Sequence, residues 1–129
     1  MRAIDTNILV RLIARDDADQ SGIADAILAA GDVVLLPTVL LEAEWVLRSR
    51  YALPRDAIAS RLSAVCGQDN VTVVSAQAVA MALSAYADKG DFADLLHYAL
   101  ATEVGAAAFA TFDQSFAAVG EEGPALEIR

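Results

Sequence analysis

The segment VVLLPTVLLEAEWVL, residues 33–47, indicates the fold class because it joins two different patterns. Its first four residues are all apolar, which is typical of a short strand buried on both faces of a sheet. Pro37 then favours a helix start, because the first turn of a helix leaves its N–H groups unpaired and proline has none. The segment therefore predicts a strand over residues 33–36 and a helix over residues 37–50.

The same alternation of strand and helix continues in both directions along the chain. Further apolar runs predict strands over residues 2–5, 71–74, 106–112 and 125–128. Helical spacing predicts helices over residues 8–15, 18–30, 54–66, 75–89 and 91–104. Buried strands that alternate with helices are typical of a parallel sheet covered on both sides. We therefore expect an α/β fold, a three-layer α/β/α sandwich around a mostly parallel sheet of four to five strands.

Length and composition limit the possible classes of protein. A chain of 129 residues suits one domain over residues 1–129, and 57% hydrophobic residues argue against disorder. No apolar run reaches the roughly 18 residues that a membrane span needs. Cys66 is the single cysteine, so we expect no intrachain disulfide and a cytoplasmic protein. The net charge of −9 argues against nonspecific nucleic-acid binding, but not against an enzyme that meets nucleic acid through metal ions.

Acidic residues stand where the expected strands end or helices begin: Asp5, Glu42, Asp94 and Asp113. Ligands of such sheets bind outside the carboxyl ends of the strands. If the first and fourth strands lie side by side, these acids face one cleft. Two like charges about 4 Å apart repel by about 4 kcal/mol at an effective dielectric near 20, so a cation is favoured there. Oxygen ligands suit Mg²⁺ or Mn²⁺ rather than zinc, and such ions activate water against a phosphodiester.

Each acid also has an ordinary structural explanation. Asp5 and Asp113 could simply cap the turns that follow them, and Asp91 suits the N-cap of the helix that carries Asp94. Asp94 is a weaker capping candidate because apolar residues surround it. Glu42 also stands among apolar residues, so we expect it on a half-buried face, and Glu44 is the better candidate for the solvent face.

Four segments together resemble the successive acidic motifs of the PIN-domain family, in particular its VapC-type toxin ribonucleases: RAIDTNILVRL, VLLEAEWVLRSRY, DFADLLHYALA and FATFDQSF. The resemblance covers nearly the whole chain, and the motifs come in the family's order. It implies the catalytic and metal-binding acids Asp5, Glu42, Asp94 and Asp113, with Asp91 as a secondary acid. It also implies that small polar residues support the carboxylates and the attacking water: Thr6, Asn7 and Thr111.

The resemblance implies an endoribonuclease that depends on Mg²⁺ or Mn²⁺ and leaves a 5′-phosphate and a 3′-hydroxyl. It also implies a cognate antitoxin as inhibitor and a homodimer as the usual form. Arginines bind phosphate bidentately, so we expect RNA contacts from residues of this type: Arg11, Arg15, Arg48 and Arg50.

Three alternatives remain open from the sequence. A receiver-like signalling domain needs an Asp after the third strand and a Lys at a later strand end, but Ser75 and the helical Lys89 stand there. A haloacid-type phosphatase needs Asp-x-Asp after the first strand, but Asn7 takes the last position. A PIN domain that binds without cleaving is the third alternative, and the full set of acids argues against it.

Overall fold

The structure is a computed structural model, and it describes residues 1–116 and 123–129. Its internal contacts divide the chain into two compact units, Met1–Val74 and Ser75–Arg129. Each unit is described by itself, and the single domain expected for residues 1–129 stays a prediction. Within the described residues, no helix combines the length and apolar character needed to cross a membrane.

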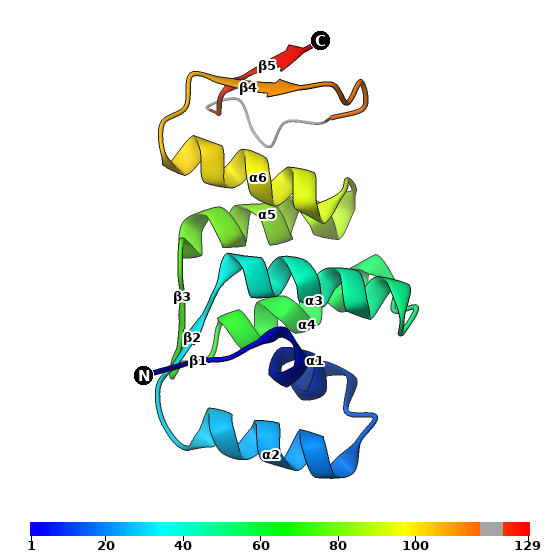
Figure 1. The fold of residues 1–129 in the computed structure, drawn as a ribbon, viewed down its shortest axis with the longest axis vertical. Coiled ribbons are helices and arrows are strands. Elements are labelled where there is room, and N and C mark those ends of the chain that lie inside the picture. The colour runs from blue at the N-terminus through cyan, green and yellow to red at the C-terminus, as the bar shows by residue number, and fades with distance from the viewer. Residues whose placement is uncertain (117–122) are drawn as a thin grey trace. The chain divides into compact units, whose positions relative to one another are not determined.

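The first unit is a parallel sheet with helices (Figure 1). Its elements are β1 (Arg2–Ala3), α1 (Thr6–Ala14), α2 (Ala18–Ala29), β2 (Val33–Leu35), α3 (Pro37–Ser49), α4 (Arg55–Cys66) and β3 (Val71–Val73). β2 is the central strand, with Val33 opposite Arg2 of β1 and opposite Val71 of β3. α1 packs against both α2 and α3, and α3 packs against α4.

The core of the first unit follows from the apolar patterns of the sequence. Val33 and Leu35 of β2 point to one face of the sheet and are fully buried, whereas Val34 on the other face is partly exposed, so the expected burial on both faces is complete on one face only. α3 buries positions 40, 43, 44 and 47, the spacing of one helix face. Pro37 stands at the start of α3, where its missing N–H costs no hydrogen bond.

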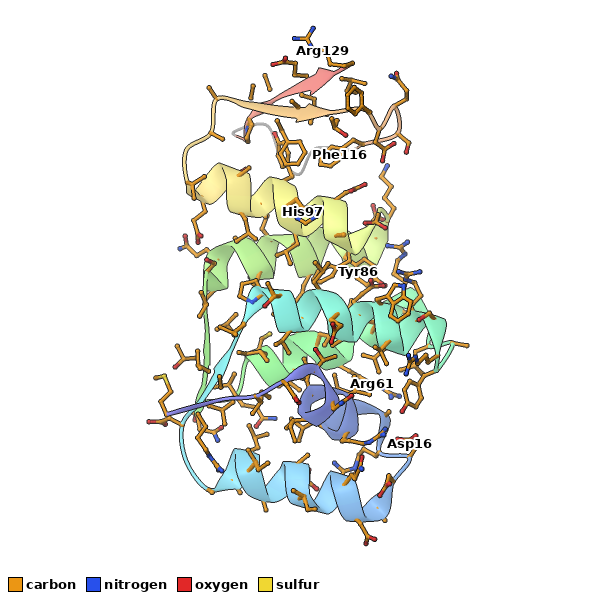
Figure 2. All side chains as sticks on the ribbon, viewed as in Figure 1. Asp16, Arg61, Tyr86, His97, Phe116 and Arg129 are labelled. Carbon is orange, nitrogen blue, oxygen red and sulfur yellow. The ribbon has the colours of Figure 1, made fainter. Side chains whose placement is uncertain are left out.

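The second unit pairs two helices and two parallel strands: α5 (Ala76–Asp88), α6 (Phe92–Glu103), β4 (Ala108–Thr111) and β5 (Ala125–Ile128). α5 packs against α6, where Tyr86 meets Phe92 edge to face at 5.2 Å between ring centroids. Figure 2 shows Phe116 between α6 and β4, and its ring stacks on Phe109 at 4.7 Å. Tyr98 of α6 meets Phe109 of β4 at 6.0 Å between ring centroids, and this contact holds β4 against α6.

The predicted α/β class with parallel strands is confirmed. The helices and strands begin and end within two residues of the predicted positions. The described residues form five strands, a three-stranded sheet in the first unit and a two-stranded sheet in the second. The sheet is therefore small. The expected pairing of the first and fourth strands concerns both units and stays a prediction.

Candidate functional site

Asp5 is both an exposed acid and a helix cap. Its carboxylate Oδ1 accepts a hydrogen bond from the backbone N–H of Ile8 at 3.1 Å, so it is the N-cap of α1. The capping interpretation of Asp5 is therefore correct. The cap fixes the orientation of the carboxylate and uses one of its oxygens, so capping and ligand binding are compatible at this residue.

A pocket of about 370 Å³ opens beside Asp5. It lies along α1 and α2, and the residues that line it are Asp5, Asn7, Ile8, Arg11, Gln20 and Ile23. Of the two small polar residues expected to support Asp5, Asn7 lines this pocket and Thr6 is buried. The pocket gives Asp5 an open approach from the solvent.

The two glutamates of α3 face opposite ways from those expected. Glu42 is exposed, whereas Glu44 is only 3% exposed. Glu44 lies on the buried face with Leu40 and Leu47, and its Oε2 accepts a bond from Nε of Arg48 at 2.7 Å. The expectation that Glu44 is the solvent-facing glutamate is therefore wrong. Arg48, one turn later on the helix, supplies the positive charge that a buried carboxylate needs.

Asp91 is the N-cap of α6 in the second unit. Its Oδ1 accepts a hydrogen bond from the backbone N–H of Asp94 at 3.0 Å. The prediction that Asp91 caps this helix is therefore confirmed. Asp94 does not provide this cap; it stands in the first turn with a half-buried side chain.

Asp113 follows β4 in a turn that holds its carboxylate. The backbone N–H and the hydroxyl of Ser115 both donate to Oδ1 of Asp113, at 2.8 and 2.7 Å. The hydroxyl oxygen of Thr111 accepts a bond from the backbone N–H of Asp113 at 3.0 Å. Thr111 thus positions the residue, consistent with its expected supporting role. Ser115 was not predicted, although an Asp two residues before a Ser is a known turn signal.

The carboxyl groups of Asp94 and Asp113 are neighbours, and each affects the pKa of the other. The pKa of Asp94 is raised, first by burial and then by the negative charges of Asp91 and Asp113, while His97 opposes the rise. The pKa of Asp113 is lowered, chiefly by the hydroxyl and backbone N–H of Ser115. The two shifts have opposite directions, so Asp94 is the more easily protonated of the two acids. His97 lies on α6 (Figure 2), three residues after Asp94 on the same side of the helix.

Two carboxyl groups in contact need a proton or a cation between them. The acids of the second unit offer only oxygen donors, which suit Mg²⁺ or Mn²⁺, so the donor chemistry fits a divalent ion. Within residues 1–116 and 123–129, no three Asp, Glu, His or Cys side chains form a ready metal-binding group. The predicted set joins Asp5 and Glu42 of one unit with Asp94 and Asp113 of the other, and it stays a prediction.

Most of the arginines expected to bind RNA have partners within the first unit. Arg11 donates to Gln20, to Asp16 and to the hydroxyl of Tyr51, at 2.6, 2.8 and 2.7 Å. Arg15 makes a bidentate pair with Asp25 at 2.9 and 2.7 Å.

Arg48 is paired with Glu44, and Arg50 instead lies over the ring of Trp45, with its guanidinium carbon 6.0 Å from the ring centroid. RNA binding by these four arginines stays a prediction, and Arg50 is the one held by an aromatic ring in place of a carboxylate.

Comparisons with known proteins give one finding. A family model described as the PIN domain matches residues 3–122, which include the four acids Asp5, Glu42, Asp94 and Asp113. Searches of curated proteins and of solved structures gave no match. PIN domains are generally nucleases that use divalent metal ions. Because the match spans nearly the whole length, the chain belongs to the PIN-domain family.

Proposed function

We propose that the protein is an endoribonuclease that requires Mg²⁺ or Mn²⁺ and acts as the toxin of a VapBC-type pair. The observation that carries the proposal is the PIN-domain match over residues 3–122, which spans Asp5, Glu42, Asp94 and Asp113. In a chain of a nuclease family, a carboxyl pair that needs a proton or a cation supports a divalent-ion site. Asp5 and Glu42 complete the proposed set of ligands.

The residues of the second unit have distinct parts in this proposal. Ser115 and Thr111 hold Asp113 ionised and in place. Asp91 fixes the start of α6, and so the position of Asp94. Asp94 and Asp113 would hold a divalent ion as carboxylates, so Asp94 would have to be ionised when the ion is bound. A divalent ion bound there would activate water and stabilise the negative charge that develops on the scissile phosphate.

The partners are part of the proposal and rest on the resemblance to VapC-type toxins. They are an RNA substrate, a cognate antitoxin and a second copy of the chain, in the cytoplasm. The net charge of −9 supports an inhibitor with a basic segment, because complementary charges favour association. The same charge makes metal ions the natural bridge between the acids and RNA phosphates.

Cleavage of total RNA by the purified protein tests this function. The reactions contain Mg²⁺, Mn²⁺ or excess EDTA, and the cut ends are mapped. We expect cleavage only with the metals, and 5′-phosphate ends. The Asp113→Asn variant, purified in parallel, controls for contaminating nucleases and should be inactive. Equal cleavage by both proteins, or full activity in EDTA, contradicts the proposal. RNA binding without cleavage in any metal indicates a binding-only PIN domain.

A further inference from the structure

The exposed face of α3 carries one aromatic residue among polar ones. Positions 38, 42, 45 and 49 recur at the spacing of a single helix face, and all four side chains are exposed. They are Thr38, Glu42, Trp45 and Ser49. Trp45 is 50% exposed and is the single tryptophan of the chain. An indole that half faces water needs an explanation, since aromatic residues contribute most to stability when buried.

The packing of α3 does not account for Trp45. The helix packs through its opposite face, where Leu40, Ala43 and Leu47 are fully buried. Three of the helix neighbours of Trp45 are exposed and polar, Glu42, Arg48 and Ser49, and the fourth, Leu41, is only partly exposed, whereas the centre of a protein–protein interface is typically apolar. A lone flat ring in polar surroundings suits a flat, polar-edged ligand better than a protein surface.

A cation stands next to this ring. Arg50, the C-cap residue of α3, holds its guanidinium carbon 6.0 Å from the centroid of Trp45. Arginine beside an exposed aromatic ring is a common arrangement in proteins that bind single-stranded nucleic acid, where the ring stacks on a base and the guanidinium meets a phosphate. The pairing of Arg48 with Glu44 leaves that arginine committed to the helix itself.

Trp45 also lies next to a proposed ligand of the metal. Glu42 and Trp45 are three residues apart on α3, so they are neighbours on the helix surface. We propose that Trp45 and Arg50 form a stacking platform that takes one unpaired base of single-stranded RNA and its phosphate, one helical turn from Glu42. The substrate class rests on the proposed function, but the platform is assigned from the contacts of α3.

The single tryptophan makes the platform directly observable. The Asp113→Asn variant, held in EDTA to prevent cleavage, is titrated with a short single-stranded RNA oligonucleotide while tryptophan fluorescence is recorded. We expect saturable quenching, because a stacked base quenches the indole. The same oligonucleotide annealed into a duplex should quench much less, because its bases are already stacked on one another.

Variants in the same background then measure affinity by the anisotropy of labelled RNA. Trp45→Leu should bind about tenfold more weakly, and Trp45→Phe should keep most of the affinity because it retains a flat ring. Arg50→Gln should weaken binding and reduce the salt slope by about 1. Ser49→Ala, on the same face, is the matched control and should bind as the parent does. Circular dichroism confirms that each variant is folded.

The possible outcomes separate this inference from the proposed function. If the wild type cleaves RNA but fluorescence does not change and Trp45→Leu binds normally, the platform is wrong and the nuclease stands. If quenching occurs but no metal supports cleavage, the platform stands and the catalytic proposal fails. If fluorescence changes with protein concentration and not with RNA, this face associates with a second copy and the inference is wrong.

Discussion

The acids of the two units are held in different ways. In the first unit, Asp5 is exposed and capped onto its own helix, and Glu42 is exposed on α3. In the second unit, Asp94 lies against Asp113 and near Asp91, and its pKa is raised by burial and by both neighbours. A cap orients a carboxylate without electrostatic conflict, whereas crowding creates a conflict that a cation relieves. Of the two sets of acids, the one in the second unit is therefore the one with electrostatic conflict.

Glu44, the buried glutamate of the first unit, differs from Asp94 in the charge of its neighbours. Glu44 is buried as well, but Arg48 is its partner at 2.7 Å. The carboxylate of Glu44 is therefore paired with a residue of the same helix, one turn away. The charges that act on Asp94 are mostly of its own sign. The buried acid of the first unit is thus paired with an arginine, whereas the half-buried Asp94 lies among charges that are mostly of its own sign.

The largest expected effect tests whether a capping acid also serves chemistry. Asp5→Asn keeps the cap, because Asn and Asp cap about equally well, but removes a charge. We expect RNA cleavage to fall by at least about 10²-fold with unchanged thermal stability. Asp17→Asn is the matched control, because Asp17 caps α2 by the same kind of bond to the N–H of Gln20. Equal loss of activity in both variants means that Asp5 has no special role.

The second prediction concerns the internally neutralised acid. Arg48→Ala removes the arginine that donates to the Glu44 carboxylate. Because that carboxylate stays buried, the free energy of unfolding should fall by about 1–3 kcal/mol. Arg15→Ala is the control: its pair with Asp25 is exposed, so the loss should be under about 1 kcal/mol. Urea denaturation measures both variants. Equal losses of stability in the two variants would show that the burial of Glu44 does not increase the contribution of its ion pair to stability.

The third prediction separates the two aspartates at the start of α6. Asp94→Asn should bind Mn²⁺ at least about tenfold more weakly than wild type, because the ion loses a charged oxygen ligand. Asp91→Asn should bind it with nearly wild-type affinity, because its main task is capping. Titration calorimetry on the folded variants measures both constants. The reverse pattern would make Asp91 the ligand and contradict the assignment of Asp94.

Removal of the cap itself has a smaller effect. Asp91→Ala deletes the acceptor for the N–H of Asp94 and should cost about 1 kcal/mol of stability. Asp91→Asn should cost a few tenths of that at most, because the amide oxygen accepts the same bond. Thermal unfolding in EDTA compares the two variants. An equal and large loss for both would mean that the charge of Asp91, and not its hydrogen bond, stabilises the helix.

The smallest effect is a dependence of stability on pH in the metal-free protein. The raised pKa of Asp94 means that the folded state binds this proton more tightly than the unfolded state does. Its stabilising contribution is complete below the ordinary pKa of Asp and is lost as the pH rises through the raised pKa. Wild type should therefore lose stability relative to Asp94→Asn over that window. A constant difference between the two proteins would contradict the raised pKa.

The pKa of Asp113 is shifted in the opposite direction, so its effect on stability appears at lower pH in the same experiment. Its lowered pKa contributes stability above the ordinary pKa of Asp, and that contribution is lost as the pH falls through the lowered value. The two windows lie on either side of the ordinary pKa of Asp, so a series of unfolding curves in EDTA resolves them. Asp113→Asn should remove the effect on the acid side and also reduce the rise in the pKa of Asp94, because the charge of Asp113 contributes to that rise.

The order of helices and strands could be predicted from the sequence because its turn signals are local. Pro37 marks the start of α3, and Gly90 separates α5 from α6 with a φ of 102° that favours glycine. Which face of α3 is buried could not be predicted in the same way. Apolar residues stand on both sides of the two glutamates, at Leu40 and Leu41 and again at Val46 and Leu47, so the apolar pattern does not fix the rotation of the helix.

The acids could be named from the sequence, but their contacts could not. The capping role of Asp91 follows from the spacing of the sequence alone, since an N-cap side chain accepts from the backbone N–H three residues later, here that of Asp94. The contact between Asp94 and Asp113 joins residues on either side of β4, and it depends on how β4 packs against α6 through Phe109, Tyr98 and Phe116. Such long-range packing leaves no periodic signal in the sequence.

The bond between the Asp94 N–H and the Asp91 carboxylate has a consequence for dynamics. The first turn of a helix frays readily, and the exchange of its amide protons with solvent reports each opening. Asp94 carries both this amide and a carboxyl group of the proposed ion site, so an ion held by the carboxyl group also restrains the amide. If Mg²⁺ slows hydrogen exchange at the Asp94 amide, the exchange rate at the start of α6 reports whether the ion is bound, in the absence of RNA and of cleavage.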